Sequence, residues 1–222
     1  MTPATPTLLK IDFVSDIVCP WCAIGLAALA QAAERLAGQV RLDWHFQPFE
    51  LNPGMGPQGE DLFEHLAAKY GSTPEQLRQM HQQIAARGAA LGLTFSERRT
   101  RIYNTFDAHR LLHWLEVEGT GEQRLALQRA LFTSYFTDGE NPGEHAVLLR
   151  LVARLGLDEA RARAVLQSQE YTDAVRQQQA FYQGQGIHSV PAVIINERHL
   201  IQGGQPVEVF EQALRQIAAQ QA

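Results

Sequence analysis

Apolar runs at the two ends of the chain predict strands. Residues 8–18 (LLKIDFVSDIV) are mostly apolar and β-branched, which predicts a buried strand followed by a short loop. Residues 40–48 alternate apolar with polar positions, the period of a strand that has one face in water. Residues 192–195 and 199–202 are two short runs around a polar turn, which predicts a hairpin. Each of these strands needs a partner, so we expect all four in one sheet.

Helical patterns occupy the rest of the chain. Residues 23–38, rich in alanine and leucine and ending in glycine, predict a helix directly after the first strand. Residues 58–180 predict a compact helical bundle, because leucines recur at helical spacing and capping residues interrupt the segment. A capping box is expected where Ser72 precedes Glu75 by three residues. The last helix is expected to carry Pro206 at its first position.

Composition narrows the function classes. The chain has 222 residues, 45% of them hydrophobic, which is enough to bury a sizeable core. Its net charge of −5 and scattered arginines leave no concentrated basic face, so we expect no nucleic-acid partner. No segment reaches the roughly 20 apolar residues that cross a bilayer, so we expect no membrane partner. The first ten residues lack the pattern of a secretory signal, so a cytoplasmic location is expected.

The two cysteines, Cys19 and Cys22, stand three positions apart at the start of the first expected helix. A disulfide across so short a loop removes little entropy from the unfolded chain, which argues against a structural role. Unpaired N–H groups at a helix start stabilise a thiolate, so Cys19 is the expected nucleophile and Cys22 the resolving thiol. Pro20 suits the first helical position. Zinc sites normally need four ligands, and with His109 and His113 expected in the core or on the surface, we predict no metal.

Two motifs flank the helical block: Cys19-Pro20-Trp21-Cys22 after the first strand, and Val190-Pro191 before the hairpin. With the segments SDIVCPWCAIG and NTFDAHRLLHW, this order resembles the DsbA family of the thioredoxin superfamily, in particular its FrnE-like branch. The resemblance covers essentially the whole chain. It implies an α/β, thioredoxin-like fold with a large all-helical insertion. Residues 1–57 and 181–222 would form a discontinuous thioredoxin-like domain, and residues 58–180 the insertion domain.

The resemblance also implies a substrate-binding surface. A cis peptide bond is expected before Pro191, where the sequence alone would equally allow a trans proline at the start of an edge strand. The backbone of Val190 is expected to pair with an extended substrate segment beside the reactive sulfur. Pro20 and Trp21, between the cysteines, are expected to contact substrate. Asp16, three residues before the first cysteine, is a candidate for tuning the thiols, with a turn-forming aspartate as the alternative.

Weaker candidates follow from the same signature. Asn104, Asp107, His109 and Arg110 are candidates for lining the cleft that faces the cysteines, although helix capping by Asn104 explains part of the pattern. Gly203-Gly204-Gln205 precedes the last helix and is a candidate for holding a carboxylate, with a tight turn as the alternative.

The favoured function is thiol–disulfide exchange. A substrate disulfide is attacked by Cys19, or a substrate thiol attacks the oxidised pair, and Cys22 resolves the mixed disulfide. The expected partners are protein or peptide thiols and disulfides. No bound cofactor is expected, and glutathione is the candidate co-substrate. The direction stays open: Pro20-Trp21 resembles the Pro-His of oxidising members, whereas a cytoplasmic setting keeps thiols reduced.

Two other functions compete with exchange. Kappa-class glutathione transferases and hydroxychromene-carboxylate isomerases are similar in fold and insertion, which makes a glutathione-dependent transferase or isomerase the alternative. Those relatives typically place serine where Cys19 stands, and a Ser-Asp pair where this chain has Gly204-Gln205, so the paired cysteines weigh against it. A third hypothesis is a binding or chaperone-like module whose thiols are incidental. The sequence predicts no oligomeric state.

Overall fold

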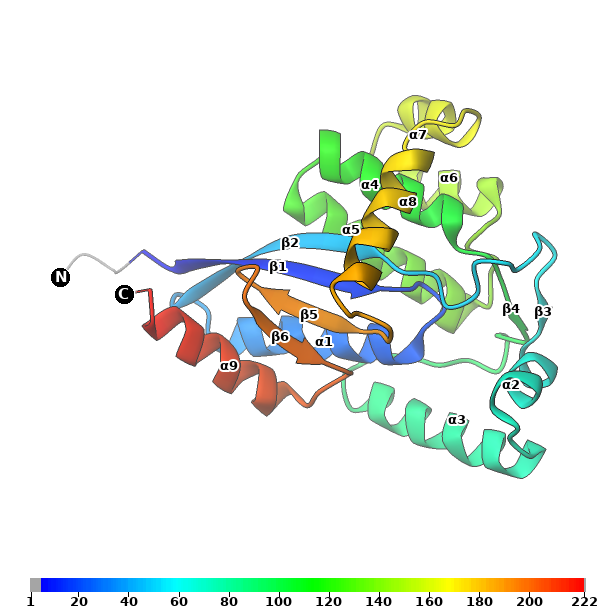
Figure 1. Ribbon diagram of the computed structural model, residues 1–222, viewed down its shortest axis with the longest axis horizontal. Helices are drawn as coiled ribbons and strands as arrows, with labels where there is room; N and C mark the ends of the chain where they lie inside the picture. Colours follow the sequence, from blue (N-terminus) through cyan, green and yellow to red (C-terminus); the bar gives the residue numbers. More distant parts are fainter. Residues whose placement is uncertain (1–4, 222) are drawn as a thin grey trace.

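A four-stranded sheet forms the centre of the molecule in the computed structural model, which describes residues 5–221 (Figure 1). Its strands are β1 (Thr7–Ser15), β2 (Val40–Pro48), β5 (Ala192–Ile195) and β6 (His199–Gln202), in the order β2-β1-β5-β6. β1 and β2 are parallel, whereas β5 is antiparallel to both β1 and β6. The α/β class is therefore confirmed, and strands from the two ends of the chain share one sheet as predicted.

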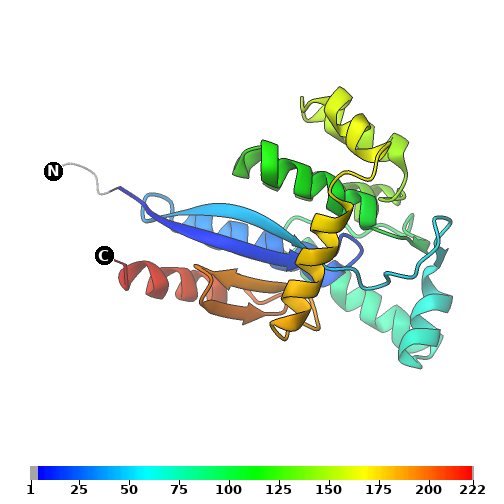
Figure 2. The same ribbon diagram turned by 45° about the horizontal axis from the view of Figure 1, so that its top comes forward.

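Helices cover both faces of this sheet. α1 (Pro20–Arg35) and α9 (Val207–Ala219) pack against each other and on one face, where Leu9, Ile11 and Phe13 of β1 are fully buried (Figure 1). α8 (Thr172–Gly184) lies across the other face (Figure 2). Successive side chains of a strand point to opposite faces of the sheet. Val14 therefore points away from Phe13 and belongs to a second apolar cluster, which contains Tyr182 of α8.

The segment between β2 and β5 is mostly helical. It contains α2 (Leu62–Tyr70), α3 (Pro74–Ala89), α4 (Phe106–Glu118), α5 (Gly121–Thr133), the π-helical turn η1 (Ser134–Asp138), α6 (His145–Arg154), α7 (Glu159–Leu166) and α8. The expectation of an all-helical insertion is wrong in one detail, because β3 (Glu60–Asp61) pairs with β4 (Arg101–Ile102). Strands of two residues are too short to give a period-two pattern in the sequence.

One buried apolar cluster runs through both the thioredoxin-like part and the insertion. The predicted boundary between them, at 180/181, falls inside α8.

Two helix starts differ from the prediction. The capping box at the start of α3 is formed by Thr73 and Gln76 rather than by Ser72 and Glu75. Pro74 occupies the first helical position, which places the N-cap on the residue before it. At the start of α9, Pro206 is itself the N-cap and the helix begins at Val207.

Within residues 5–221, no helix combines the length and the apolar character needed to cross a membrane.

Candidate active site

Cys19 is the N-cap of α1, and Pro20 occupies the first turn of that helix as predicted. The Cys19 amide donates to the Asp16 carbonyl at 3.1 Å, which closes the turn between β1 and α1. The Cys19 thiol donates to the Val190 carbonyl at 3.7 Å. The first turn of α1 contains no acidic residue, so the positive end of the helix dipole faces the sulfur unopposed.

Cys22 lies one turn further along α1 and is more deeply buried. Both cysteines are free thiols; Cys19 is 4% exposed and Cys22 is 0% exposed. Burial raises the pKa of the Cys22 thiol well above its usual range, and the neighbouring Cys19 thiol raises it further. A hydrogen bond from the Asp16 backbone lowers the pKa of Cys22 and so acts in the opposite direction. Cys22 therefore stays protonated in the reduced protein, as suits a resolving thiol.

The Val190–Pro191 peptide bond is cis, as the sequence resemblance implied. α1 and the turn between β6 and α9 approach it closely. A Cβ added to Gly25 of α1 would lie 3.1 Å from the Pro191 Cγ and 3.5 Å from the Gly204 Cα. A Cβ added to Gly204 would lie 2.9 Å from the Trp21 carbonyl oxygen. Glycine at both positions lets three segments meet around the dithiol.

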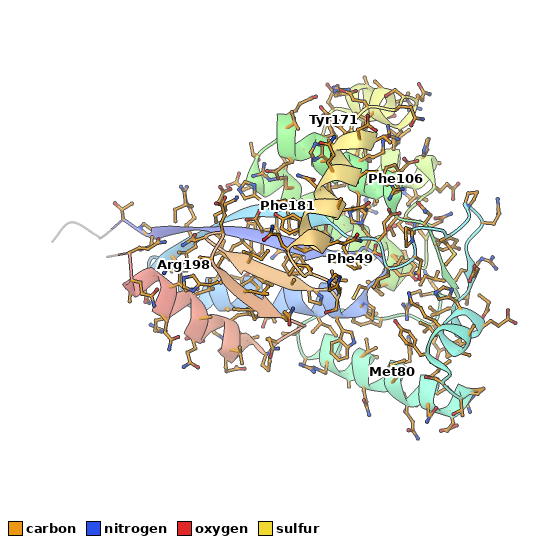
Figure 3. All side chains as sticks on the ribbon, viewed as in Figure 1. Phe49, Met80, Phe106, Tyr171, Phe181 and Arg198 are labelled. Atoms are coloured by element: carbon orange, nitrogen blue, oxygen red, sulfur yellow. The ribbon has the colours of Figure 1, made fainter. Side chains whose placement is uncertain are left out.

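Asp16 and His109 meet in the buried layer behind Cys19. Both are nearly inaccessible, at 1% and 2% exposure. The Asp16 Oδ2 accepts from the Leu51 amide at 2.7 Å, and the Asp16 Oδ1 lies 3.6 Å from the His109 Nε2. That nitrogen also lies 3.1 Å from the carbonyl oxygen of Phe49, which packs near the end of α8 (Figure 3). Among the described residues, the Asp16 Oδ1 has no hydrogen-bond partner.

One site neighbour was not found by sequence reasoning. The Arg87 guanidinium, near the end of α3, lies over the Trp21 ring with its central carbon 5.0 Å from the ring centroid. It also donates to the Gly204 carbonyl at 3.2 Å. No sequence signal marks this arginine, since its position depends on how α3 docks on α1.

Comparison with known proteins identifies the family. A family profile described as DSBA-like thioredoxin domain matches residues 10–215. The chain belongs to the DsbA-like thioredoxin family. Its thiol–disulfide oxidoreductase class follows from that membership, whereas placement in the FrnE-like branch stays a prediction.

Three solved structures are similar to this chain. A probable DsbA oxidoreductase from Streptomyces coelicolor is 32% identical, with 96% of this chain and 91% of that chain covered and a TM-score of 0.86. The cytosolic disulfide reductase DsbM from Pseudomonas aeruginosa, in its structure with GSH, is 22% identical (93% and 98% covered, TM-score 0.60). A 2-hydroxychromene-2-carboxylate isomerase is 16% identical (96% and 97% covered, TM-score 0.72). The last two are similar in fold.

In this DsbA-like chain, the remaining helical candidates contact other parts of the segment between β2 and β5. The Asn104 side chain accepts from the Phe106 amide at 2.9 Å and donates to the Met55 carbonyl at 3.2 Å, so it holds the start of α4 against the loop after β2. The Arg110 side chain instead reaches backbone carbonyls between residues 165 and 170. Asp107 pairs with Arg110 at 2.8 Å and with His145 at 2.7 Å.

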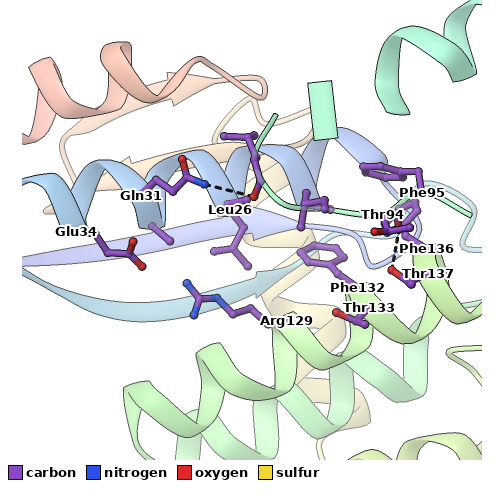
Figure 4. Close-up of a pocket in the computed structure, with 15 residues that line it drawn as sticks. Leu26, Gln31, Glu34, Thr94, Phe95, Arg129, Phe132, Thr133, Phe136 and Thr137 are labelled. Carbon is purple, nitrogen blue, oxygen red and sulfur yellow. Dashed lines mark hydrogen bonds between the residues drawn. The ribbon is translucent and has the colours of Figure 1, made fainter. Parts of the chain in front are cut away.

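A pocket of about 290 Å³ lies along α1, between that helix and α5 with η1 (Figure 4). Phe132 and Phe136 contribute to its apolar lining, and the Thr137 hydroxyl donates to the Thr94 carbonyl at 2.8 Å. Neither cysteine lines this pocket, so the DsbA-like chemistry does not take place in it. Across residues 5–221, no cluster of three or more His, Cys, Asp or Glu side chains is arranged to hold a metal ion.

Proposed function

We propose that this protein exchanges dithiols with disulfides, with Cys19 as the nucleophile and Cys22 as the resolving thiol. The observation that carries the proposal is the position of the Cys19 sulfur. It lies at the N-terminus of α1 and 3.7 Å from the Val190 carbonyl, directly before a cis proline. A substrate strand that paired with the Val190 backbone would bring its own sulfur beside Cys19.

The proposed cycle balances electrons between the dithiol and the substrate. The Cys19 thiolate attacks a substrate disulfide, which breaks that S–S bond, forms a mixed disulfide and releases one substrate sulfur as a thiolate. Cys22 then loses its proton and attacks the Cys19 sulfur. This step closes the Cys19–Cys22 disulfide and releases the second substrate sulfur. The substrate gains the two electrons that the dithiol loses, and the reverse sequence oxidises a substrate dithiol.

Asp16 is the proposed acceptor for the Cys22 proton. Its backbone hydrogen-bonds the Cys22 thiol, and its carboxylate keeps one oxygen without a donor in the described structure. A buried oxygen that lacks a hydrogen-bond donor gains a partner when it takes up a proton. The Leu51 amide, which donates to the other carboxylate oxygen at 2.7 Å, would hold the carboxylate in place.

The proposed substrates are protein or peptide thiols and disulfides, with glutathione as a small co-substrate. The half-buried Pro20, Trp21 and Val190 surround Cys19 and would contact the substrate together with Pro191. The DsbM relative was solved with GSH, which supports a small thiol at this kind of site. The cycle needs no other cofactor, and a reducing cytoplasm would supply the glutathione.

The decisive measurement is the reduction potential of the Cys19/Cys22 pair. Protein equilibrated in glutathione buffers is quenched with acid and treated with a mass-tagged thiol reagent. A single two-electron transition is expected, with a midpoint near about −270 mV for a reductant or about −120 mV for an oxidant. Cys22→Ser should accumulate the mixed disulfide at Cys19, whereas Cys19→Ser should form none.

The alternative function is glutathione-dependent isomerisation or transfer, which the fold of the isomerase relative supports. A chain that formed no reversible disulfide, yet bound glutathione with Cys22→Ser as well as with both cysteines, would favour it over exchange. Binding of unfolded peptide that survived replacement of both cysteines would instead favour a chaperone-like module.

A further inference from the structure

Arg87 brings a cation from the insertion to the edge of the dithiol. It belongs to the last turn of α3, and Figure 1 shows this end of α3 close to the connection between β6 and α9. Its guanidinium lies over the ring of Trp21, the residue between the two cysteines, and donates to the Gly204 carbonyl at 3.2 Å. The two contacts place the guanidinium next to Trp21 in the Cys19-Pro20-Trp21-Cys22 motif.

The charges around Arg87 are unbalanced. A groove of about 290 Å³ lies between α1, the end of α3 and the start of α9, and Arg87, Arg35 and Glu208 contribute its charged lining. Arg35 is already paired with Glu208 at 3.1 Å and with Glu211 at 3.3 Å. Arg87 has no carboxylate within ion-pair distance among residues 5–221, and its side chain is exposed. Neither cysteine lines this groove, but the unpaired Arg87 guanidinium at its edge lies over Trp21, the residue between the two cysteines.

A cation–π contact with an indole ring suits an arginine that binds anions. Such a contact uses the charge of the guanidinium and needs none of its N–H groups as hydrogen-bond donors. The Gly204 carbonyl takes one donor, so further N–H groups stay available for a two-pronged contact with a carboxylate. Because the group is already held in place, less conformational entropy is lost when a carboxylate binds.

We propose that Arg87 is a specificity-determining residue that recognises a carboxylate next to the reacting sulfur of the substrate. This inference rests on the proposed exchange function and adds a substrate class, acidic thiols and disulfides. The carboxylate could belong to a small thiol such as glutathione or to an acidic residue beside a peptide cysteine. Its recognition by Arg87 is the same in both cases.

The test compares charge preference in matched variants. Reduced protein is mixed with glutathione disulfide and, separately, with its tetraethyl ester, in which the carboxylates are neutralised. A second probe pair uses a short peptide disulfide with glutamate or with glutamine beside the cysteine. Rate constants come from acid quenching and mass spectrometry, for wild type, Arg87→Met and Arg87→Lys. Arg78→Met is the control, because Arg78 is exposed on the same helix and pairs with Glu75 instead.

We expect Arg87→Met to lower the acidic-to-neutral rate ratio about tenfold or more, as loss of a charge-assisted hydrogen bond implies. Arg87→Lys should recover part of the ratio, high salt should reduce it in wild type, and Arg78→Met should leave it unchanged. An effect confined to the glutathione pair identifies a small acidic thiol, and one confined to the peptide pair an acidic peptide.

An unchanged ratio in Arg87→Met would overturn the inference. Equal slowing with acidic and neutral probes would also overturn it, since Arg87 would then act through Trp21 or the fold. Failure of the exchange function looks different, because wild type would then react with none of the four probes.

Discussion

Arg110 provides a sharp test of how the insertion is stabilised. The side chain is 3% exposed, and its guanidinium donates to the backbone carbonyls of Val165, Ser168 and Glu170 and to the Asp107 carboxylate. It thus binds the end of α7 and the segment after it. Arg110→Met keeps much of the apolar stem but removes every one of these donors.

The expected loss is large because the Arg110 guanidinium and the Val165 carbonyl that it binds are buried. Breaking a buried ion pair by removing one partner costs about 3–5 kcal/mol, and the orphaned carbonyls belong to that penalty. A chain of 222 residues shifts its Tm by about 2–4 °C for each kcal/mol. Arg110→Met should therefore lower the Tm by roughly 6–20 °C.

The matched control is Arg163→Met on the adjacent helix α7. Arg163 pairs with Glu159, and both side chains are about half exposed, so this change should cost less than about 1 kcal/mol. Urea unfolding followed by circular dichroism gives both free energies, and the potential of the dithiol is measured in parallel. Equal free energies for the two variants would refute the reasoning. A shifted potential at unchanged stability would place Arg110 at the dithiol instead.

Three further predictions concern the sheet, the cis proline and the buried acid. Hydrogen bonding to Glu116 raises the pKa of His45 in the folded protein. The stability that protonated His45 contributes is therefore fully present below about pH 6.5 and is lost as the pH rises through the folded-state pKa. His45→Gln should lower the free energy of unfolding more at pH 6 than at pH 9. Gly25→Val should lower the free energy of unfolding by about 1–3 kcal/mol and slow reaction with disulfides, because the added side chain meets Pro191. Gly184→Val is the control, because nothing lies within 4 Å of its added Cβ, and it should leave the exchange rate unchanged. Asp16→Asn should slow the Cys22 step about tenfold or more in single-turnover quenching, and an unaltered rate and pH profile would remove Asp16 as the proton acceptor.

The parts of the fold that follow from local pattern were predicted well. The hairpin at 192–195 and 199–202 matches β5 and β6 residue for residue, because a polar turn bounds each short run. The capping box was misplaced by one residue, since Ser72 and Thr73 are both good caps and only Pro74 decides between them. The β3–β4 pairing joins segments about 40 residues apart and leaves no mark in either one.

The candidate site likewise has a part that local sequence patterns predict and a part that depends on tertiary packing. Cys19 and Cys22 are predicted as the site from their spacing at a helix start, and the cis bond before Pro191 follows from the resemblance to the DsbA family. The contact between Asp16 and His109 joins β1 to α4, so it needs the insertion to be placed on the sheet. Nothing in the sequence near Arg87 predicted its place over Trp21, because α3 must dock on α1 first.

With the roles proposed for Asp16 and Arg87, the insertion would take part in the chemistry as well as in the fold. It supplies His109, which lies 3.6 Å from the Asp16 carboxylate, and Arg87, which lies over Trp21 between the two cysteines. Under the two proposals above, a change in the packing of α3 should alter substrate choice, whereas a change in the packing of α4 should alter the surroundings of the Asp16 carboxylate. The two effects are separable because Arg87 is exposed and His109 is buried, so salt weakens the first and leaves the second largely unscreened.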